Sequence, residues 1–190
     1  MLATLLVEFF LAAYTLVRYR STLFGRIVAT ILLFLAVFQL AEYQICTSRS
    51  YEVFWSRIGF FAITLLPLLG LYLVSLISHK THFLRAGYVL SLFYVLYFVF
   101  VPKAIGSVFC GGNYVIFNSP QMLYIFYGFY YFGFLLFAIW EALERVVSVR
   151  GRVREKRVLF WFVVGYLSFM LPMGTAYIIS PAVRQAIPSV

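Results

Sequence analysis

Six long apolar runs, separated by short polar segments, form the main pattern of this sequence. They cover approximately residues 2–17, 27–46, 58–78, 86–102, 121–144 and 158–180. Each run is close to the length of about 17–25 residues that a membrane-crossing helix needs, and none has the period of two that marks a membrane β-strand. The pattern therefore predicts an all-α, polytopic transmembrane helical bundle with six spans in a single domain, residues 1–190.

The basic residues predict how the spans are oriented. An external N-terminus places 11 of the 15 lysines and arginines on the cytoplasmic side, which agrees with the positive-inside rule. Residues 103–119 then form an outer loop, and residues 145–157 form a basic inner loop. The first run has Arg18 and Arg20 after it and no basic residue before it, so we interpret it as a retained helix and not as a signal peptide. We expect a multi-pass protein of the inner (plasma) membrane.

Composition supports this class and limits the partners. Hydrophobic residues make up 64% of the chain and charged residues only 11%, too few to cover a soluble domain of this size. The net charge of +9 could indicate nucleic acid, but the basic residues lie between the apolar runs, where they act as topology signals. The expected partner is the lipid bilayer, with the basic inner loop close to anionic headgroups, and no nucleic acid.

The two cysteines are candidates for a disulfide. Cys46 ends the second run on the predicted outer side, and Cys110 lies in the predicted outer loop. Both would face an oxidising space, in which disulfides persist. A bridge would tie the outer loop across the mouth of the bundle; the alternative is two unpaired thiols.

Glu8 is the most unusual polar residue, because it lies inside the first apolar run. At about 1.5 Å per residue it is roughly 15 Å from the basic boundary at Arg18, near the centre of the bilayer. An ionisable residue at such a depth is costly and is a functional-site candidate.

Other polar groups are expected at a similar depth in the outer half. Gln39 lies about 10 Å below the outer boundary, and Glu42 lies about 6 Å below it on the same helix face. The expected ligand-binding residues are Glu8, Gln39, Glu42 and Tyr127, in a layer that also includes Thr64. Pro67 and Pro172 are expected to kink the third and sixth helices beside this layer.

Two alternatives for the polar layer remain open. Glu8 could be protonated and donate a hydrogen bond to Gln39 as structural glue, with Tyr127 packing around Gly128 and Gly133. The layer could also be an ion or proton path. Glu141, by contrast, is expected at a solvated inner helix end, without a function.

The sequence contains no pattern that indicates an enzyme. His79 and His82 lie at one helix–loop junction with no cysteine or aspartate nearby, so no metal site is expected. Nucleophile, phosphate-binding and Cys-x-x-Cys motifs are also absent from the sequence. We expect a protein that is not an enzyme and has no cofactor.

The order of features resembles the N-terminal seven-helix membrane region of bacterial sensor histidine kinases and related signalling proteins. The features that carry the resemblance extend over nearly the whole chain: Glu42, Trp55–Arg57, Leu66–Leu68, Tyr114–Pro120, the basic connector Val149–Arg157, Gly165 and Pro172. The resemblance implies that the bundle senses a signal outside or within the membrane and passes it to cytoplasmic output domains.

This chain differs from that pattern because it has six predicted spans and no output segment. A seventh helix and an output domain could follow, or a protein partner could carry the output. The main hypothesis is a sensory or receptor-like module that binds a small apolar or amphipathic ligand in the outer half and signals by helix repacking. The alternatives are a structural or accessory subunit of a membrane complex, and a small transporter or proton pathway.

Overall fold

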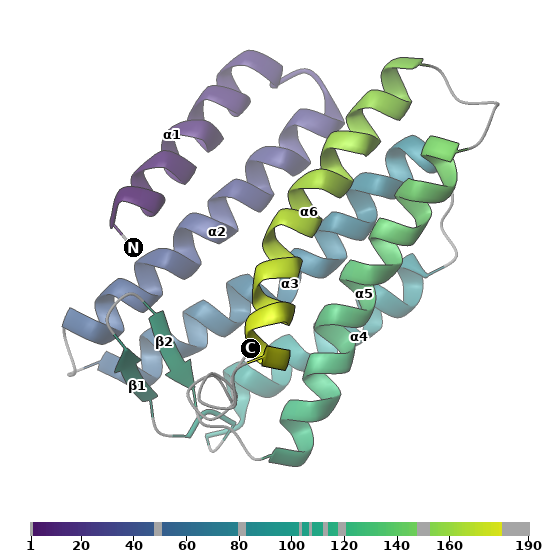
Figure 1. The fold of residues 1–190 in the computed structure, drawn as a ribbon. Coiled ribbons are helices and arrows are strands. Elements are labelled where there is room, and N and C mark those ends of the chain that lie inside the picture. The colour runs from purple at the N-terminus through teal and green to yellow at the C-terminus, as the bar shows by residue number, and fades with distance from the viewer. Residues whose placement is uncertain are drawn as a thin grey trace.

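Six helices and one β-hairpin make up the part of the chain that the computed structural model describes, which is residues 2–47, 51–79, 83–102, 104–106, 108–111, 114–117, 121–147 and 153–179 (Figure 1). In chain order the elements are α1 (Leu2–Tyr19), α2 (Leu23–Thr47), α3 (Glu52–Ser78), α4 (Leu84–Phe100), β1 (Val108–Gly111), β2 (Tyr114–Phe117), α5 (Gln121–Val147) and α6 (Val153–Ile179). Each predicted apolar run overlaps one helix. The predicted helical-bundle fold class is confirmed.

The helices have the length and the surface of membrane helices. Among the described residues, α1, α2, α3 and the segment Ile125–Val147 of α5 are long and apolar enough to cross a bilayer, and α4 is apolar but shorter. Large apolar side chains are exposed on the outside of the bundle, such as Val17 at 84% and Phe129 at 72%. In a bilayer, lipid would surround these apolar side chains, whereas their exposure to water would cost free energy. Six spans remain a prediction.

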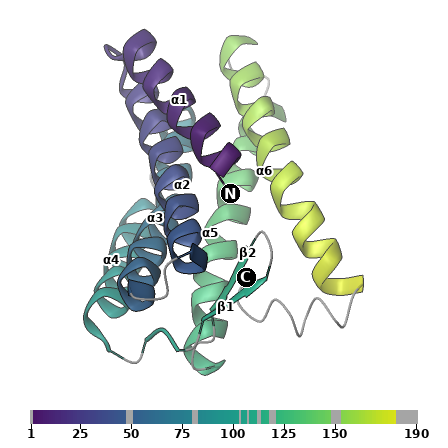
Figure 2. The same cartoon turned by 90° about the vertical axis from the view of Figure 1, so that its left-hand side faces the viewer.

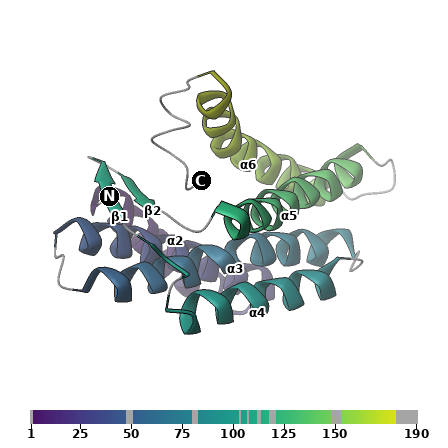
Figure 3. The same ribbon diagram turned by 90° about the horizontal axis from the view of Figure 1, so that it is seen from below.

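Helix α3 is the centre of the arrangement. It packs against α2, α4 and α5, while α1 packs mainly on α2 and α6 mainly on α5. Figure 3 shows α5 and α6 on one side of the layer that contains α2, α3 and α4. Figure 2 shows that α6 diverges from α5 toward its C-terminal end. The polar residues of α3 can therefore contact three other helices.

A tight connection joins α1 to α2. The side-chain oxygen of Thr22 accepts a hydrogen bond from the Gly25 N–H at 3.1 Å and so caps the start of α2. Gly25 is required here, because a Cβ at this position would collide with the side chain and carbonyl of Tyr19. This short turn makes α1 and α2 antiparallel neighbours.

The predicted outer loop contains a β-hairpin that was not expected. Strands β1 and β2 pair antiparallel, with Cys110 opposite Val115. The two residues between the strands in the sequence are Gly112 and Asn113, a pair typical of two-residue hairpin turns. This signal could have identified the hairpin. Strand β2 contacts α2, so the hairpin lies against the end of that helix.

The interior has two parts. The aromatic cluster, near the hairpin, consists of Ile45, Phe60, Tyr94, Phe98, Ala104, Tyr127, Tyr130, Tyr131 and Leu135. The aliphatic cluster, nearer the other end, consists of Leu71, Val74, Leu84, Ala138, Ile139, Ala142, Leu159 and Val163. Tyr166 and Met170 of α6 pack against both clusters. Pro67 is fully buried within α3, which continues as a helix on both sides; Pro172 lies within α6, where the described part of the structure does not include its side chain.

Candidate functional site

Three buried hydrogen bonds connect α3, α4 and α5 inside the aromatic cluster. The hydroxyls of Thr64 and Tyr127 are 3.1 Å apart, and the Tyr130 hydroxyl donates to the Thr64 carbonyl at 2.6 Å. The Ser91 hydroxyl lies 2.7 Å from that of Tyr130. Because the single Tyr130 proton goes to the carbonyl, Ser91 is the donor in this last bond. We call Thr64, Ser91, Tyr127 and Tyr130 the hydroxyl cluster.

The position of Pro67 explains why α3 offers an acceptor here. Proline has no N–H, so the carbonyl four residues earlier, that of Ile63, loses its usual helical donor. Thr64 is the next residue, and its carbonyl accepts the external bond from Tyr130. In a membrane, neighbouring helices commonly satisfy backbone groups beside a proline in this way. The hydroxyl cluster therefore links α5 to the part of α3 that proline weakens.

Aromatic rings enclose the hydroxyl cluster. The Tyr127 ring centroid is 5.1 Å from that of Phe98 and 5.2 Å from that of Tyr94. The rings of Phe60 and Phe98 are stacked at 4.4 Å. These separations are typical of favourable ring pairs. The tyrosine hydroxyls thus lie in an apolar environment in which an unmade hydrogen bond is costly.

The predicted ligand-binding residues occupy two separate places. Tyr127 belongs to the aromatic cluster. Glu42 is buried, at 7% exposed, and lies one helical turn before Ile45 of the same cluster, so both share a face of α2. Gln39 is half-buried and lies one helical turn before Glu42 on α2. These three residues lie in the half of the bundle nearer the hairpin.

Glu8 lies in a different interface. The four residues of α1 that are not exposed are Leu5, Glu8, Ala12 and Thr15, which follow helical spacing, and α1 packs mainly on α2. Glu8 Oε2 is buried and has no hydrogen-bond partner among the described residues. Glu8 lies 11 residues before the end of α1 at Tyr19, and Phe34 lies 11 residues after the start of α2 at Leu23. Because a short turn joins these two helix ends, Glu8 and Phe34 lie at about the same height along the bundle. Gln39 lies about 7 Å further along α2, and the expected bond to Glu8 is not seen at Oε2.

One expectation about the other end of the bundle is wrong. Glu141 is only 4% exposed and therefore does not lie at a solvated helix end. Helices α3 and α5 run parallel, and the bonds of Thr64 to Tyr127 and Tyr130 show that positions 63 to 66 residues apart lie near one level. This offset places Glu141 at the level of the buried Ser75 and Ser78 of α3. Arg145 nearby forms an ion pair with Glu155 of α6 at 3.6 Å.

Tyr130 and Ser91 were missed as site residues by reasoning from the sequence. Tyr130 lies one position away from the tyrosine stripe that includes Tyr127 and Tyr131, and Ser91 is the one serine or threonine of the largely apolar α4. A buried serine in such a helix needs a partner on a neighbouring helix, which is the signal that could have identified it. Among the described residues, no group of three or more His, Cys, Asp or Glu residues could hold a metal ion.

A double-mutant cycle tests the contact between α3 and α5. We expect Thr64→Val and Tyr127→Phe to couple by about 0.5–1.5 kcal/mol, the usual size of an interhelical hydrogen bond in a membrane protein. The measurement is unfolding of the four proteins in bicelles. Additive effects would show that the two hydroxyls do not interact. Because both changes keep the side-chain shape, the cycle separates the bond from packing.

Comparisons of this chain with protein-family models, with curated proteins and with solved structures found no match.

Proposed function

We propose that this chain is a membrane-embedded sensory module that binds a small apolar or amphipathic ligand at the hairpin end of the bundle and responds by helix repacking. The observation that carries the proposal is the hydroxyl cluster, because it joins three helices beside Pro67 inside an aromatic enclosure. Aromatic walls with a few convergent polar groups are typical of small-molecule sites. The proposal assigns no catalytic role to any residue.

The position of the hairpin supports an external site. The Cys46–Cys110 disulfide tethers the hairpin to α2, and disulfides persist in oxidising compartments. We therefore propose that this end of the bundle and the N-terminus face outward across a plasma membrane. Glu42 and Gln39 on α2 would supply polar contacts at the rim, and Tyr127 would supply the deepest one. Glu8 is a less direct candidate, since it lies between α1 and α2.

The proposed response starts at the Tyr130 hydroxyl. A ligand that hydrogen-bonds to Tyr127 or Tyr130 would compete with the bonds to Thr64 and Ser91. Losing them would free α5 to shift against α3 beside Pro67, and α5 leads directly into the basic connector. A ligand can shift this equilibrium only by its difference in affinity for the two packings. A protein partner or a following cytoplasmic segment would receive the shift, as in the sensor kinases that the sequence resembles.

One observation favours a second function, an accessory subunit of a membrane complex. The Tyr127 hydroxyl is already paired and its ring is packed on several sides. This is what a dry structural core would show. In that case the exposed aromatic side chains of α5, such as Phe129, would bury against another chain.

Thermal unfolding in nanodiscs distinguishes the two functions. The full chain is incubated with a panel of medium-chain alcohols and fatty acids, and the shift in Tm is measured. A ligand at a hundredfold excess over its Kd stabilises the protein by about 2.7 kcal/mol, which would raise Tm by several degrees. We expect Tyr127→Phe and Glu42→Gln to reduce this ligand-induced shift.

The matched control is Tyr14→Phe, because Tyr14 is exposed on α1, away from the aromatic cluster. This variant should keep the ligand-induced shift unchanged. Equal shifts in Tyr14→Phe and Tyr127→Phe would mean that the amphiphile acts through the bilayer and not through the site. If no amphiphile shifts Tm, the accessory-subunit function is favoured.

A further inference from the structure

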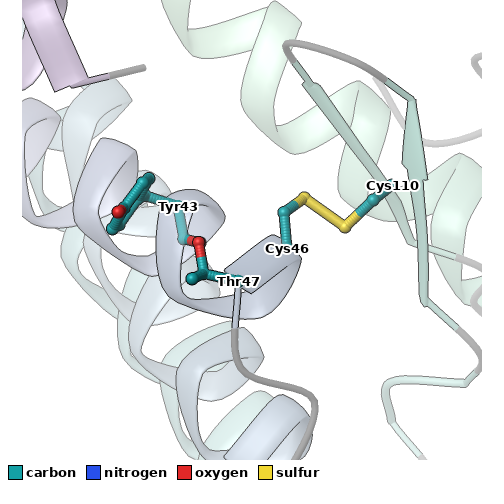
Figure 4. Close-up of a disulfide and its surroundings, with 4 residues drawn as sticks. All are labelled: Tyr43, Cys46, Thr47 and Cys110. Carbon is teal, nitrogen blue, oxygen red and sulfur yellow. A yellow bond between two sulfur atoms is a disulfide. The ribbon is translucent and has the colours of Figure 1, made fainter.

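The Cys46–Cys110 disulfide joins a rigid helix end to a small exposed element. Cys46 lies in the last turn of α2, where the Thr47 side chain donates to the Tyr43 carbonyl at 2.8 Å (Figure 4). Cys110 lies within β1, and the two Cα atoms are 5.7 Å apart, within the ordinary range for a disulfide. The predicted bridge is therefore confirmed.

The two sulfur atoms differ in their surroundings. Cys110 is exposed, whereas Cys46 is half-buried and packs against the aromatic cluster together with Trp55. Access is one of the factors that determine which sulfur of a disulfide an incoming thiolate attacks. The geometry thus favours attack at Cys110 with Cys46 as the leaving group.

The hairpin has few contacts that could hold it in place without the bridge. Each strand has four residues, and the strands contact mainly each other. Beyond that pairing, its main contact with the helices is that of β2 with α2. An isolated two-stranded hairpin is marginally stable at best. Opening the disulfide would therefore release the hairpin without disturbing the packing of α3 on α4 and α5.

We propose that Cys46–Cys110 is a thiol-exchange site for a dithiol reductant outside the membrane, and that its reduction releases the hairpin from α2. A thiolate of the reductant attacks Cys110 Sγ, the Cys46–Cys110 bond breaks, and Cys46 leaves as a thiolate that takes a proton from water. The second thiol of the reductant, as its thiolate, then attacks the mixed disulfide and frees Cys110, which is also protonated. The protein gains two thiols, and the reductant is oxidised to its disulfide.

Release would change access to the aromatic cluster. Ile45 is a buried member of this cluster and Cys46 packs against it, so the hairpin contacts α2 at the turn that reaches the cluster. This inference does not rest on the proposed ligand site, because a chain that binds no ligand can still exchange its disulfide. The ligand site is tested by thermal unfolding with amphiphiles, whereas thiol exchange is tested by thiol labelling, so each proposal can fail while the other holds.

The first test uses the full chain in nanodiscs with dithiothreitol as the probe. Free thiols are trapped with a maleimide and counted by mass spectrometry, while circular dichroism monitors helix content. We expect both cysteines to be labelled with no loss of helical signal. Labelling that requires heat or denaturing detergent would overturn the proposal, because the disulfide would then be inaccessible in the folded protein.

The second test identifies the attacked sulfur. A charged monothiol, 2-mercaptoethanesulfonate, is added, and the released thiol is alkylated at once. We expect the mixed disulfide on Cys110 and the alkyl group on Cys46. The reverse pattern would contradict the assignment of Cys110 as the accessible sulfur.

Hydrogen exchange tests the release itself. After reduction, we expect the amides of β1 and β2 to exchange at least about tenfold faster, while those of α3 stay unchanged. The Cys46→Ala/Cys110→Ala variant should show the same fast exchange without reductant. Reduced wild-type protein provides the same measurement if that variant does not fold. Unchanged exchange in the reduced hairpin would show that the disulfide does not hold it.

Discussion

Replacing Tyr130 with phenylalanine should lower the free energy of unfolding by roughly 1–3 kcal/mol, although only one oxygen atom is removed. The Tyr130 hydroxyl donates to the Thr64 carbonyl and accepts from Ser91. Tyr130 is 4% exposed, so water cannot replace these bonds. The variant removes the bond that Tyr130 adds to the Thr64 carbonyl and takes away the acceptor of the Ser91 hydroxyl, so it breaks contacts with two different helices. The measurement is reversible unfolding in bicelles, followed by circular dichroism.

Two variants bracket this result. Ser91→Ala removes only one of the two bonds and should cost about 1 kcal/mol or less. Tyr14→Phe removes a hydroxyl from an exposed position on α1 and should leave stability unchanged. A Tyr130→Phe protein as stable as Tyr14→Phe would mean that the hydroxyl cluster does not join the helices. The link between α3 and α5 would then rest on ring packing alone.

The second large effect is a loss of stability that we expect from a glycine substitution on α3 and not from the same substitution on α5. A Cβ added at Gly70 of α3 would collide with the hydroxyl of Tyr166 on α6. The Tyr166 ring lies tilted against the Phe162 ring with centroids 4.2 Å apart and packs against both clusters, so it cannot move aside freely. We expect Gly70→Ala to destabilise the protein by about 1–3 kcal/mol, the usual cost of overpacking.

Gly133→Ala is the matched control. In the part of the chain that the structure describes, no heavy atom outside the adjoining backbone of α5 lies within 4 Å of the position that its Cβ would occupy. Alanine is favoured over glycine in a helix by up to about 1 kcal/mol, so this change should be neutral or stabilising. Both variants are compared by thermal unfolding in nanodiscs. Equal effects at Gly70 and Gly133 would show that Tyr166 does not pack closely on α3.

The same glycines bear on the structural alternative for the polar layer. In that alternative the tyrosines of α5 pack around Gly128 and Gly133, which as small residues would permit close helix approach. Among the described residues, and apart from the adjoining backbone of α5, an added Cβ meets no heavy atom within 4 Å at either position. Close approach occurs instead at Gly70 and at Gly87, where an added Cβ would lie 3.1 Å from Leu68 and 3.2 Å from Phe134. The sequence contains the glycines but not the neighbours that make some of them necessary.

The disulfide illustrates a prediction that succeeded through topology. Cys46 and Cys110 are 64 residues apart, and no local pattern pairs them. The order of the apolar runs places both cysteines on the same side of the bundle, and this shared side is the basis on which the sequence predicted the bridge. The hairpin around Cys110 was missed, because strands of four residues are too short to show a clear periodicity.

The sequence by itself determined that this protein is an apolar helical bundle. A chain in a bilayer must satisfy its backbone hydrogen bonds internally, so long apolar runs become helices wherever they occur. The tertiary structure alone decided which polar groups meet. A helix that is apolar on all sides has no polar face to indicate its rotation, and lipid accepts nearly any apolar face. Packing therefore directs Tyr130 to the Thr64 carbonyl and Glu8 toward α2.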